Sequence, residues 1–180
     1  IGGSLVIREE GCYFNRFVWM RPNGQITTYD KRHLFRMAGE HLYYTPGHNR
    51  VVVRLGDFRL CLMICYDLRF PVFFRTKNDY DVLVCVANWP AERQDAWETL
   101  LKARAIENQA YVIGVNRVGS DGSDLHYRGG TAVYNYLGET LESELDKEVT
   151  FAIEIQKDGL EEYRKSFPVL TDADRFEVKT

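Results

Sequence analysis

Residues 58–71 read Phe-Arg-Leu-Cys-Leu-Met-Ile-Cys-Tyr-Asp-Leu-Arg-Phe-Pro and are the most informative stretch of the chain. The part up to Cys65 is almost wholly apolar, which is typical of a strand buried on both faces. The pattern then changes abruptly, and Pro71 is tolerated at the first position of a helix. The stretch predicts a buried strand, a tight turn at Cys65 and a helix that begins near Pro71.

Strand and helix patterns continue on both sides of this stretch. The other expected strands are residues 1–8, 13–20, 25–29, 51–55, 82–87, 111–115, 131–136, 140–144 and the alternating segment 149–155. An amphipathic helix is expected from about Trp97 to Asn108, and a short one around Tyr163. Residues 30–50 show no sustained period and predict a long functional loop or short helical turns. The pattern predicts an α/β fold with a mixed sheet, flanking helices and sheet-on-sheet packing, because strands outnumber helices.

Composition and charge exclude several classes of protein. A chain of 180 residues is about one domain long, so we expect a single folded domain over residues 1–180. Hydrophobic residues make up 45% and charged residues 27%, which excludes a disordered or collagen-like chain. The net charge of −3, without a basic stripe, argues against nucleic acid as a partner. The longest uncharged stretches, such as 82–91 and 129–138, are shorter than the roughly 20 residues that span a bilayer, so we expect a soluble protein.

The four cysteines are Cys12, Cys61, Cys65 and Cys85, and no two of them form a Cys-x-x-Cys pair. Three of them lie in apolar, strand-like runs, which argues against a zinc site and against a disulfide framework. We therefore expect a reducing, cytoplasmic compartment.

Cys65 is the cysteine with a catalytic context. A residue between a strand and a helix projects above the sheet edge, where backbone N–H groups and the helix dipole favour a thiolate and an oxyanion. A small buried core cysteine is the alternative, and topology alone does not separate the two. Cys61, on the same face of the strand, and Cys85, in mid-strand, are expected in the core.

Other candidate residues are ambiguous from spacing alone. Lys31 follows a strand, where a lysine is more often surface charge, and Glu40 has no distinguishing context. Arg104 and Glu107 lie at i and i+3 on one helix face and predict a structural ion pair. A cysteine–histidine dyad would need Cys65 and one of four histidines, among which spacing does not choose: His33, His41, His48 and His126.

Several motifs give the chain a resemblance to a known family. They are Tyr-Asp-Lys-Arg-His-Leu-Phe at 29–35 with Glu40 downstream, Cys-Tyr-Asp-Leu-Arg-Phe-Pro at 65–71, Ala-Asn-Trp-Pro at 87–90, and Arg-Ala-Ile-Glu-Asn-Gln-Ala-Tyr at 104–111 followed by Asn-Arg-Val-Gly at 116–119. In this order they resemble the carbon–nitrogen hydrolases of the nitrilase superfamily, from residue 1 to about 167. The chain is most similar to bacterial ω-amidases, for which its Lys-Arg-His-Leu-Phe-Arg-Met and Ala-Asn-Trp-Pro segments are much more specific than the Glu, Lys and Cys of the whole superfamily.

The resemblance implies an α-β-β-α sandwich and an enzyme that hydrolyses linear amides. The implied substrate is a small 2-oxo acid amide, such as 2-oxoglutaramate or 2-oxosuccinamate. Its terminal amide would be converted to the acid and ammonia through a cysteine thioester. The resemblance implies no metal or organic cofactor, and it implies a homo-oligomer, a dimer or larger.

The resemblance also assigns roles to individual residues. Cys65 matches the nucleophile, and Lys31 matches the cation that stabilises the oxyanion and would lower the pKa of the nearby thiol. Glu40 matches the glutamate that holds the lysine and the attacking water. The residues implied in substrate binding are Tyr66, whose backbone N–H would be a second oxyanion donor, Asn88 and Trp89. Structural support is the favoured role of Asp67, Arg69, Arg104 and Glu107.

One motif of the family is missing from the sequence. The family's general-base glutamate follows an earlier strand in a Pro-Glu motif, and no such motif precedes Lys31. Glu9 and Glu10 lie in a turn, in the wrong order for this role. The chain also begins at Ile1 in mid-pattern, so we expect an N-terminally incomplete domain that lacks the first strand–helix units and the base.

Two other functions remain open from the sequence. The chain could belong to another branch of the superfamily, acting on a nitrile, an N-carbamoyl amino acid or a deaminated peptide derivative. If the base is absent from the whole protein, the chain could instead be a binding domain without turnover.

Overall fold

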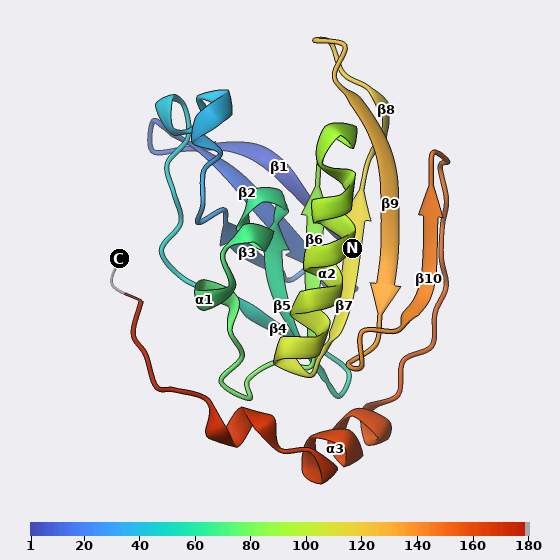
Figure 1. Ribbon diagram of the computed structural model, residues 1–180. Coiled ribbons are helices and arrows are strands. Elements are labelled where there is room, and N and C mark those ends of the chain that lie inside the picture. The colour runs from blue at the N-terminus through green and yellow to red at the C-terminus, as the bar shows by residue number, and fades with distance from the viewer. Residues whose placement is uncertain (179–180) are drawn as a thin grey trace.

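In the computed structural model, which describes residues 1–178, the strands form two sheets that lie face to face (Figure 1). The first sheet is antiparallel and contains β1 (Gly2–Glu9), β2 (Cys12–Met20) and β3 (Ile26–Asp30), in that order. Gly24 has a φ of +81°, which the tight turn between β2 and β3 requires and which glycine adopts without strain. The strands expected in residues 1–29 are thus confirmed.

The second sheet is larger and mixed. Its strand order is β10-β9-β7-β6-β5-β4, in which β5, β6 and β7 run parallel to one another. The bounds are β4 (Val52–Leu55), β5 (Phe58–Ile64), β6 (Val82–Ala87), β7 (Tyr111–Asn116), β9 (His126–Tyr134) and β10 (Thr140–Leu145), with β8 (Val118–Ser120) paired to β9 outside this path. Every strand expected between residues 51 and 144 is confirmed with small shifts of its bounds, except that β9 begins at His126, well before the expected residue 131.

Helix α2 lies across one face of the second sheet and connects β6 to β7, while α3 lies below the ends of the strands (Figure 1). The α-helices are α1 (Pro71–Phe74), α2 (Gln94–Asn108) and α3 (Lys157–Ser166), and the 3-10 helices are η1 (Arg36–Ala38), η2 (Glu40–Leu42), η3 (Cys65–Arg69), η4 (Ala91–Arg93) and η5 (Val169–Asp172). The three helices predicted from the sequence are confirmed. Within residues 1–178, no helix is long and apolar enough to cross a membrane.

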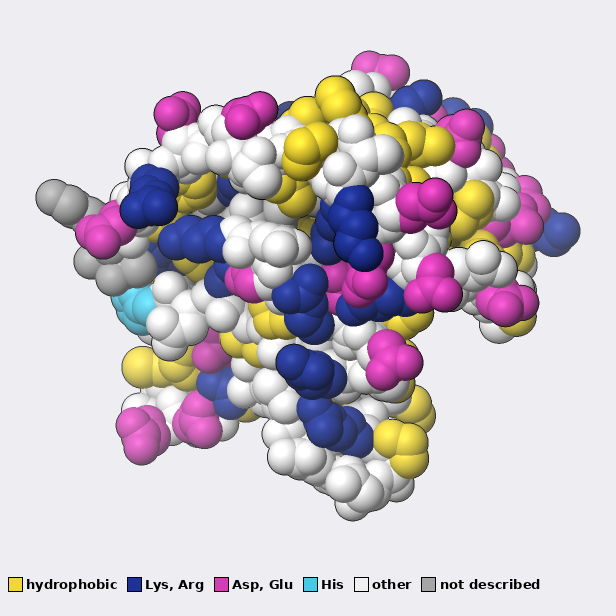
Figure 2. All heavy atoms as spheres, turned by 90° about the horizontal axis from the view of Figure 1, so that it is seen from below, with side chains coloured by type: hydrophobic (Ala, Val, Ile, Leu, Met, Phe, Trp, Pro, Cys, Tyr) yellow, Lys and Arg dark blue, Asp and Glu magenta, His cyan; other side chains and the backbone are white. Residues whose placement is uncertain are grey.

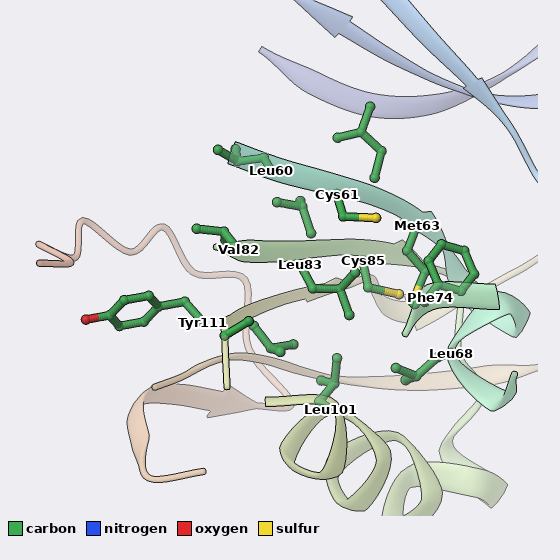
Figure 3. Packing of buried hydrophobic residues seen from close by; sticks show 14 of the residues in the cluster. Leu60, Cys61, Met63, Leu68, Phe74, Val82, Leu83, Cys85, Leu101 and Tyr111 are labelled. Atoms are coloured by element: carbon green, nitrogen blue, oxygen red, sulfur yellow. The ribbon is translucent and has the colours of Figure 1, made fainter. Parts of the chain in front are cut away.

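The core lies on both faces of the second sheet. Leu101 of α2 is fully buried and packs against Gly114 of β7, where a Cβ would overlap its side chain. Figure 3 shows Cys61 and Cys85 among the apolar side chains of the core, and both cysteines are fully buried. Their expected place in the core is therefore confirmed.

The described residues form three layers, in the order α2, second sheet and first sheet (Figure 1). The α-β-β-α sandwich has a further helical layer on the first sheet, and residues 1–178 place no helix there. The first sheet exposes large apolar side chains, among them Leu5, Met20 and Ile26, which the register places on the face opposite the buried Phe17. These strands thus have an apolar surface that the described residues leave uncovered.

Residues 149–155 are not a strand, contrary to the prediction. The alternation survives as alternating burial, because Phe151, Ile153 and Ile155 are half-buried while the residues between them are exposed. Among the described residues, this segment joins neither sheet, and β10 is the last strand of its sheet. A period of two places one side of a segment against the body of the protein, but a strand also needs a hydrogen-bonded neighbour.

Helix α3 is joined to the sheet by a cluster of half-buried cations around the buried Asp81. The Asp81 carboxylate is fully buried just before β6 and accepts hydrogen bonds from Arg59 (2.7 Å), Lys157 (2.8 Å) and Arg164 (3.1 Å). Lys157 and Arg164 belong to α3. Figure 2 views the molecule from the side of α3 and shows Lys and Arg side chains gathered in the middle of this face.

Replacing Asp81 should destabilise the protein in a pH-dependent way. Burial would raise the pKa of Asp81, but hydrogen bonds from Arg59 and Lys157 outweigh it and hold the pKa well below its usual range. A depressed carboxylate pKa gives stability that is present above about pH 4 and is lost as the pH falls further. Asp81→Asn should lower the free energy of unfolding in urea by about 3 kcal/mol at pH 7, and the difference should shrink below about pH 4. An equal difference at all pH values would contradict this account.

Candidate active site

Cys65 lies directly after β5, at the carboxyl end of a parallel strand, and is the first residue of η3. Its φ is +46°, in the left-handed region that residues other than glycine seldom adopt. The thiol is 3.7 Å from the backbone oxygen of Asn88, to which it donates a hydrogen bond. The strand and sharp turn predicted here are confirmed, and the strained backbone at Cys65 is typical of a nucleophile held at a sheet edge.

Lys31 lies directly after β3 and points inward. Lys31 is only 3% exposed, so the common interpretation of a lysine at a strand end as surface charge does not apply. The ammonium lies 2.7 Å from Oε2 of Glu40, and the backbone N–H of Lys31 donates to the Asn15 carbonyl at 2.9 Å. The first sheet therefore delivers a buried cation to the site.

Glu40, the first residue of η2, is the partner of Lys31. Its Oε2 also accepts from the Phe35 backbone N–H at 2.6 Å, and its Oε1 accepts from the Asn15 side chain at 3.1 Å. Burial would raise the pKa of Glu40, but the charge of Lys31 and these hydrogen bonds outweigh it and lower the pKa. The carboxylate is therefore ionised and occupied by three donors, which suits it to hold Lys31.

Lys31, Glu40 and Cys65 line one cavity of about 280 Å³. They come from three separate segments, at the end of β3, in η2 and after β5. Asn88 lies on its wall as well. Among the described residues that line this cavity, Glu40 is the only carboxylate. The structure thus brings together the three residues that the resemblance assigned to catalysis.

The thiol of Cys65 is neutral at physiological pH. Burial raises its pKa above the ordinary value of 9.0, and the opposite effect of Lys31 is smaller. The prediction that Lys31 lowers the pKa is correct in sign, but burial outweighs it. The thiol must therefore give up its proton when it attacks.

A second cavity, of about 510 Å³, also reaches Cys65. Tyr66, Asn88 and Trp89, the residues implied in substrate binding, line it. Two arginines that the sequence did not single out for binding, Arg69 and Arg93, line it too. Arg69 was expected to give structural support, and its guanidinium lies 4.9 Å from the centre of the Trp89 ring. The sequence signal that could have indicated a binding role for Arg69 was its position four residues after Cys65.

Among the described residues, no histidine lines either cavity next to Cys65, and the thiol donates to the Asn88 carbonyl instead, so the structure does not support a cysteine–histidine dyad. His33 instead places its ring Nδ1 2.8 Å from Asp67 and stacks on Phe70 with a centroid separation of 4.0 Å.

Helix α2 supports the turn from behind. Arg104 donates to Glu107 at 3.0 Å, which confirms the predicted ion pair, and to the Leu68 carbonyl of η3 at 2.6 Å. Asn116, at the end of β7, accepts from the Trp89 N–H at 2.7 Å and donates to the Trp89 carbonyl at 3.0 Å. These contacts fix both the turn at Cys65 and the Ala-Asn-Trp-Pro segment.

The comparisons with known proteins agree with this geometry. Residues 1–165 match the family model described as carbon-nitrogen hydrolase, so the chain belongs to the carbon–nitrogen hydrolase family. Over 179 residues it is 50% identical to the omega-amidase YafV of Escherichia coli strain K12, covering 99% of this chain and 70% of that protein. It is 35% identical to the 2-oxoglutaramate amidase of Bacillus subtilis, over 96% of this chain and 67% of that protein.

A solved structure has nearly the same backbone. The carbon–nitrogen hydrolase XC1258 of Xanthomonas campestris superposes with a TM-score of 0.97 at 44% identity, over 99% of this chain and 70% of that protein. That crystal structure is described as carrying an arsenic adduct in its active site. The nitrilase-type fold implied by the resemblance is thus confirmed.

The pKa of Cys65 can be tested by alkylation. The rate at which iodoacetamide labels Cys65 should rise with pH to a midpoint above 9, because burial raises the pKa of the thiol. Lys31→Met should move the midpoint higher still, since the cation favours the thiolate. Peptide mass spectrometry measures the labelling, and the exposed Cys12 in the same digest should be unaffected by Lys31→Met. A midpoint that stays in place in Lys31→Met would show that Lys31 does not act on the thiol.

Proposed function

We propose that the protein is an ω-amidase, which hydrolyses the terminal amide of a small 2-oxo acid amide to the acid and ammonia. The observation that carries this proposal is the place of Cys65 between two cavities, one with Lys31 and the other with Arg69 and Arg93. The printed functions of the similar proteins, omega-amidase and 2-oxoglutaramate amidase, support it.

The chemistry begins with attack of the Cys65 sulfur on the amide carbon. The thiol gives up its proton, which the amide nitrogen takes up when it leaves, and the carbonyl oxygen becomes an oxyanion beside the Lys31 ammonium and the Tyr66 backbone N–H. A buried, fixed cation stabilises such a charge more than water does. The tetrahedral intermediate collapses as the nitrogen takes up a proton and leaves as ammonia. Water then hydrolyses the thioester, which releases the acid and restores the thiol.

Glu40 acts by holding Lys31 in this reaction. Its carboxylate stays ionised because Lys31 and two other donors stabilise the charge. A buried ammonium without a partner would lose its proton or turn toward solvent. Glu40 thereby keeps the charge that the oxyanion needs.

The second cavity fits the far end of the substrate. A 2-oxo acid amide carries a carboxylate at the end opposite its amide, and arginine is the side chain best suited to bind a carboxylate. Arg93 has an ion-pair partner in Glu92, which is exposed and 3.6 Å away, so its guanidinium can turn to a ligand. Asp121 also lines the cavity, but its carboxylate accepts from the Tyr127 hydroxyl at 2.8 Å.

Two further expectations stay predictions. We propose that the protein is a homo-oligomer of at least two copies and that it is cytoplasmic. The four cysteines of the chain are free in the structure, as expected for a reducing compartment.

The role of the arginines can be tested with a matched pair of substrates. 2-Oxoglutaramate and 4-oxopentanamide differ in that a methyl group replaces the carboxylate. Arg93→Gln should raise KM for 2-oxoglutaramate about 10- to 100-fold, because a charged hydrogen bond contributes about 1.5–3 kcal/mol, and should leave KM for 4-oxopentanamide unchanged. Ammonia release measures both.

The control variant is Arg128→Gln, which removes a guanidinium from the exposed pair with Asp146 and lies outside both cavities. It should alter neither KM. If the unmodified enzyme hydrolyses 4-oxopentanamide and 2-oxoglutaramate with equal kcat/KM, the carboxylate is not recognised and the substrate class is wrong. Faster release of ammonia from a deaminated peptide amide would favour another branch of the family.

A further inference from the structure

Asp67 connects the two halves of the site. Its side chain is fully buried in η3, two residues after Cys65. Oδ2 accepts from the Tyr29 hydroxyl at 2.6 Å and from the Ile64 backbone N–H at 3.2 Å. Oδ1 accepts from the backbone N–H and the ring Nδ1 of His33, at 2.9 Å and 2.8 Å. One carboxylate thus accepts four hydrogen bonds from three residues.

These partners flank both reacting groups. Tyr29 lies two residues before Lys31 and His33 two residues after it, while Ile64 directly precedes Cys65. The Tyr29 hydroxyl in turn accepts from the Arg32 backbone N–H at 3.1 Å. The carboxylate therefore holds the backbone on both sides of the lysine and next to the cysteine.

The connection runs from one sheet to the other. β3, which ends next to Lys31, belongs to the first sheet, and β5, which ends next to Cys65, belongs to the second. The relative position of lysine and cysteine therefore depends on contacts between the sheets at this edge. Asp67 supplies the polar contacts there, and the stacking of His33 on Phe70 adds an apolar one.

We propose that Asp67 is a positioning residue that sets the separation of the Lys31 ammonium and the Cys65 thiol. The inference rests on the proposed function in that these two groups perform the reaction. The left-handed backbone at Cys65 needs surrounding contacts to persist, and Asp67 provides one at Ile64. A displacement of about 1 Å between reacting groups can lower a rate about 10²-fold.

The partners of Asp67 differ from those of a purely structural carboxylate. Asp81, at the opposite end of the parallel strands, is held mainly by the long side chains of Arg59, Lys157 and Arg164, which adapt to its position, and by one backbone N–H, that of Arg59. Asp67 forms no ion pair with a lysine or arginine of residues 1–178, and two of its donors are backbone N–H groups. Backbone donors cannot adapt without moving the chain, so Asp67 fixes the chain itself.

The test uses Tyr29→Phe with Tyr80→Phe as its matched control. Both tyrosines are fully buried, and each hydroxyl donates one hydrogen bond, from Tyr29 to Asp67 and from Tyr80 to the Phe74 carbonyl at 2.7 Å. Tyr29→Phe changes no charge, so its effect on Cys65 has to act through position. We expect kcat on 2-oxoglutaramate to fall about 3- to 10-fold with KM unchanged, and the midpoint of Cys65 alkylation to move to higher pH. Tyr80→Phe should move neither.

Two further variants complete the test. Asp67→Asn should lower kcat about 10- to 100-fold, and adding Tyr29→Phe to it should lower kcat little more, because both act through one contact. Its alkylation midpoint is not compared, since the Asp67 charge itself raises the pKa of Cys65. In Lys31→Met, Tyr29→Phe should no longer shift the midpoint.

The outcomes separate this inference from the proposed function. If Tyr29→Phe folds and keeps the alkylation midpoint and kcat of the unmodified protein, the positioning role is overturned. It is also overturned if Tyr29→Phe still shifts the alkylation midpoint when Lys31→Met is present. If Asp67→Asn does not fold, Tyr29→Phe alone decides. If the unmodified protein does not hydrolyse 2-oxoglutaramate, the proposed function fails, while the alkylation midpoints still test the positioning role.

Discussion

The buried ion pair of Lys31 and Glu40 constrains the rest of the site. Taking an ammonium out of water costs several kcal/mol unless a partner compensates, and Glu40 compensates at 2.7 Å. The chain between the two residues must therefore turn back on itself. Gly39, with a φ of +71° between η1 and η2, makes that turn possible without strain. The segment at residues 30–50, which has no periodicity in the sequence, thus brings the Glu40 carboxylate back to Lys31.

The two ends of the parallel strands in the second sheet have different roles. At the carboxyl ends of β5 and β6, Cys65 and Asn88 meet the cavities, as is usual for ligand sites in parallel sheets. At the opposite ends, Asp81 and its cations join α3 to the sheet and contribute stability. Strain at Cys65 is thereby placed far from the cluster that secures the fold. Asp67 is the exception, because it is a fully buried carboxylate at the functional edge.

Much of the fold could be predicted because its signals are local. The apolar run before Cys65 and the spacing of Trp97 and Leu101 indicated a strand and a helix that the structure confirms. The prediction of a strand at residues 149–155 was wrong because strand pairing depends on a neighbour that is distant in the sequence. The burial of Lys31 and the arginines near Cys65 were equally invisible to spacing, since each depends on segments that only the fold brings together. The resemblance to a family, not periodicity, singled out Lys31 and Glu40.

The central claim is that Cys65 forms a thioester with the substrate, and trapping that intermediate tests it most directly. The protein is mixed with 2-oxoglutaramate, quenched in acid within a turnover, digested and analysed by mass spectrometry. The account predicts that the peptide containing Cys65 gains the mass of the substrate minus ammonia, and that Cys65→Ala gives neither adduct nor turnover. An unmodified Cys65 peptide together with ammonia release by Cys65→Ala would contradict it.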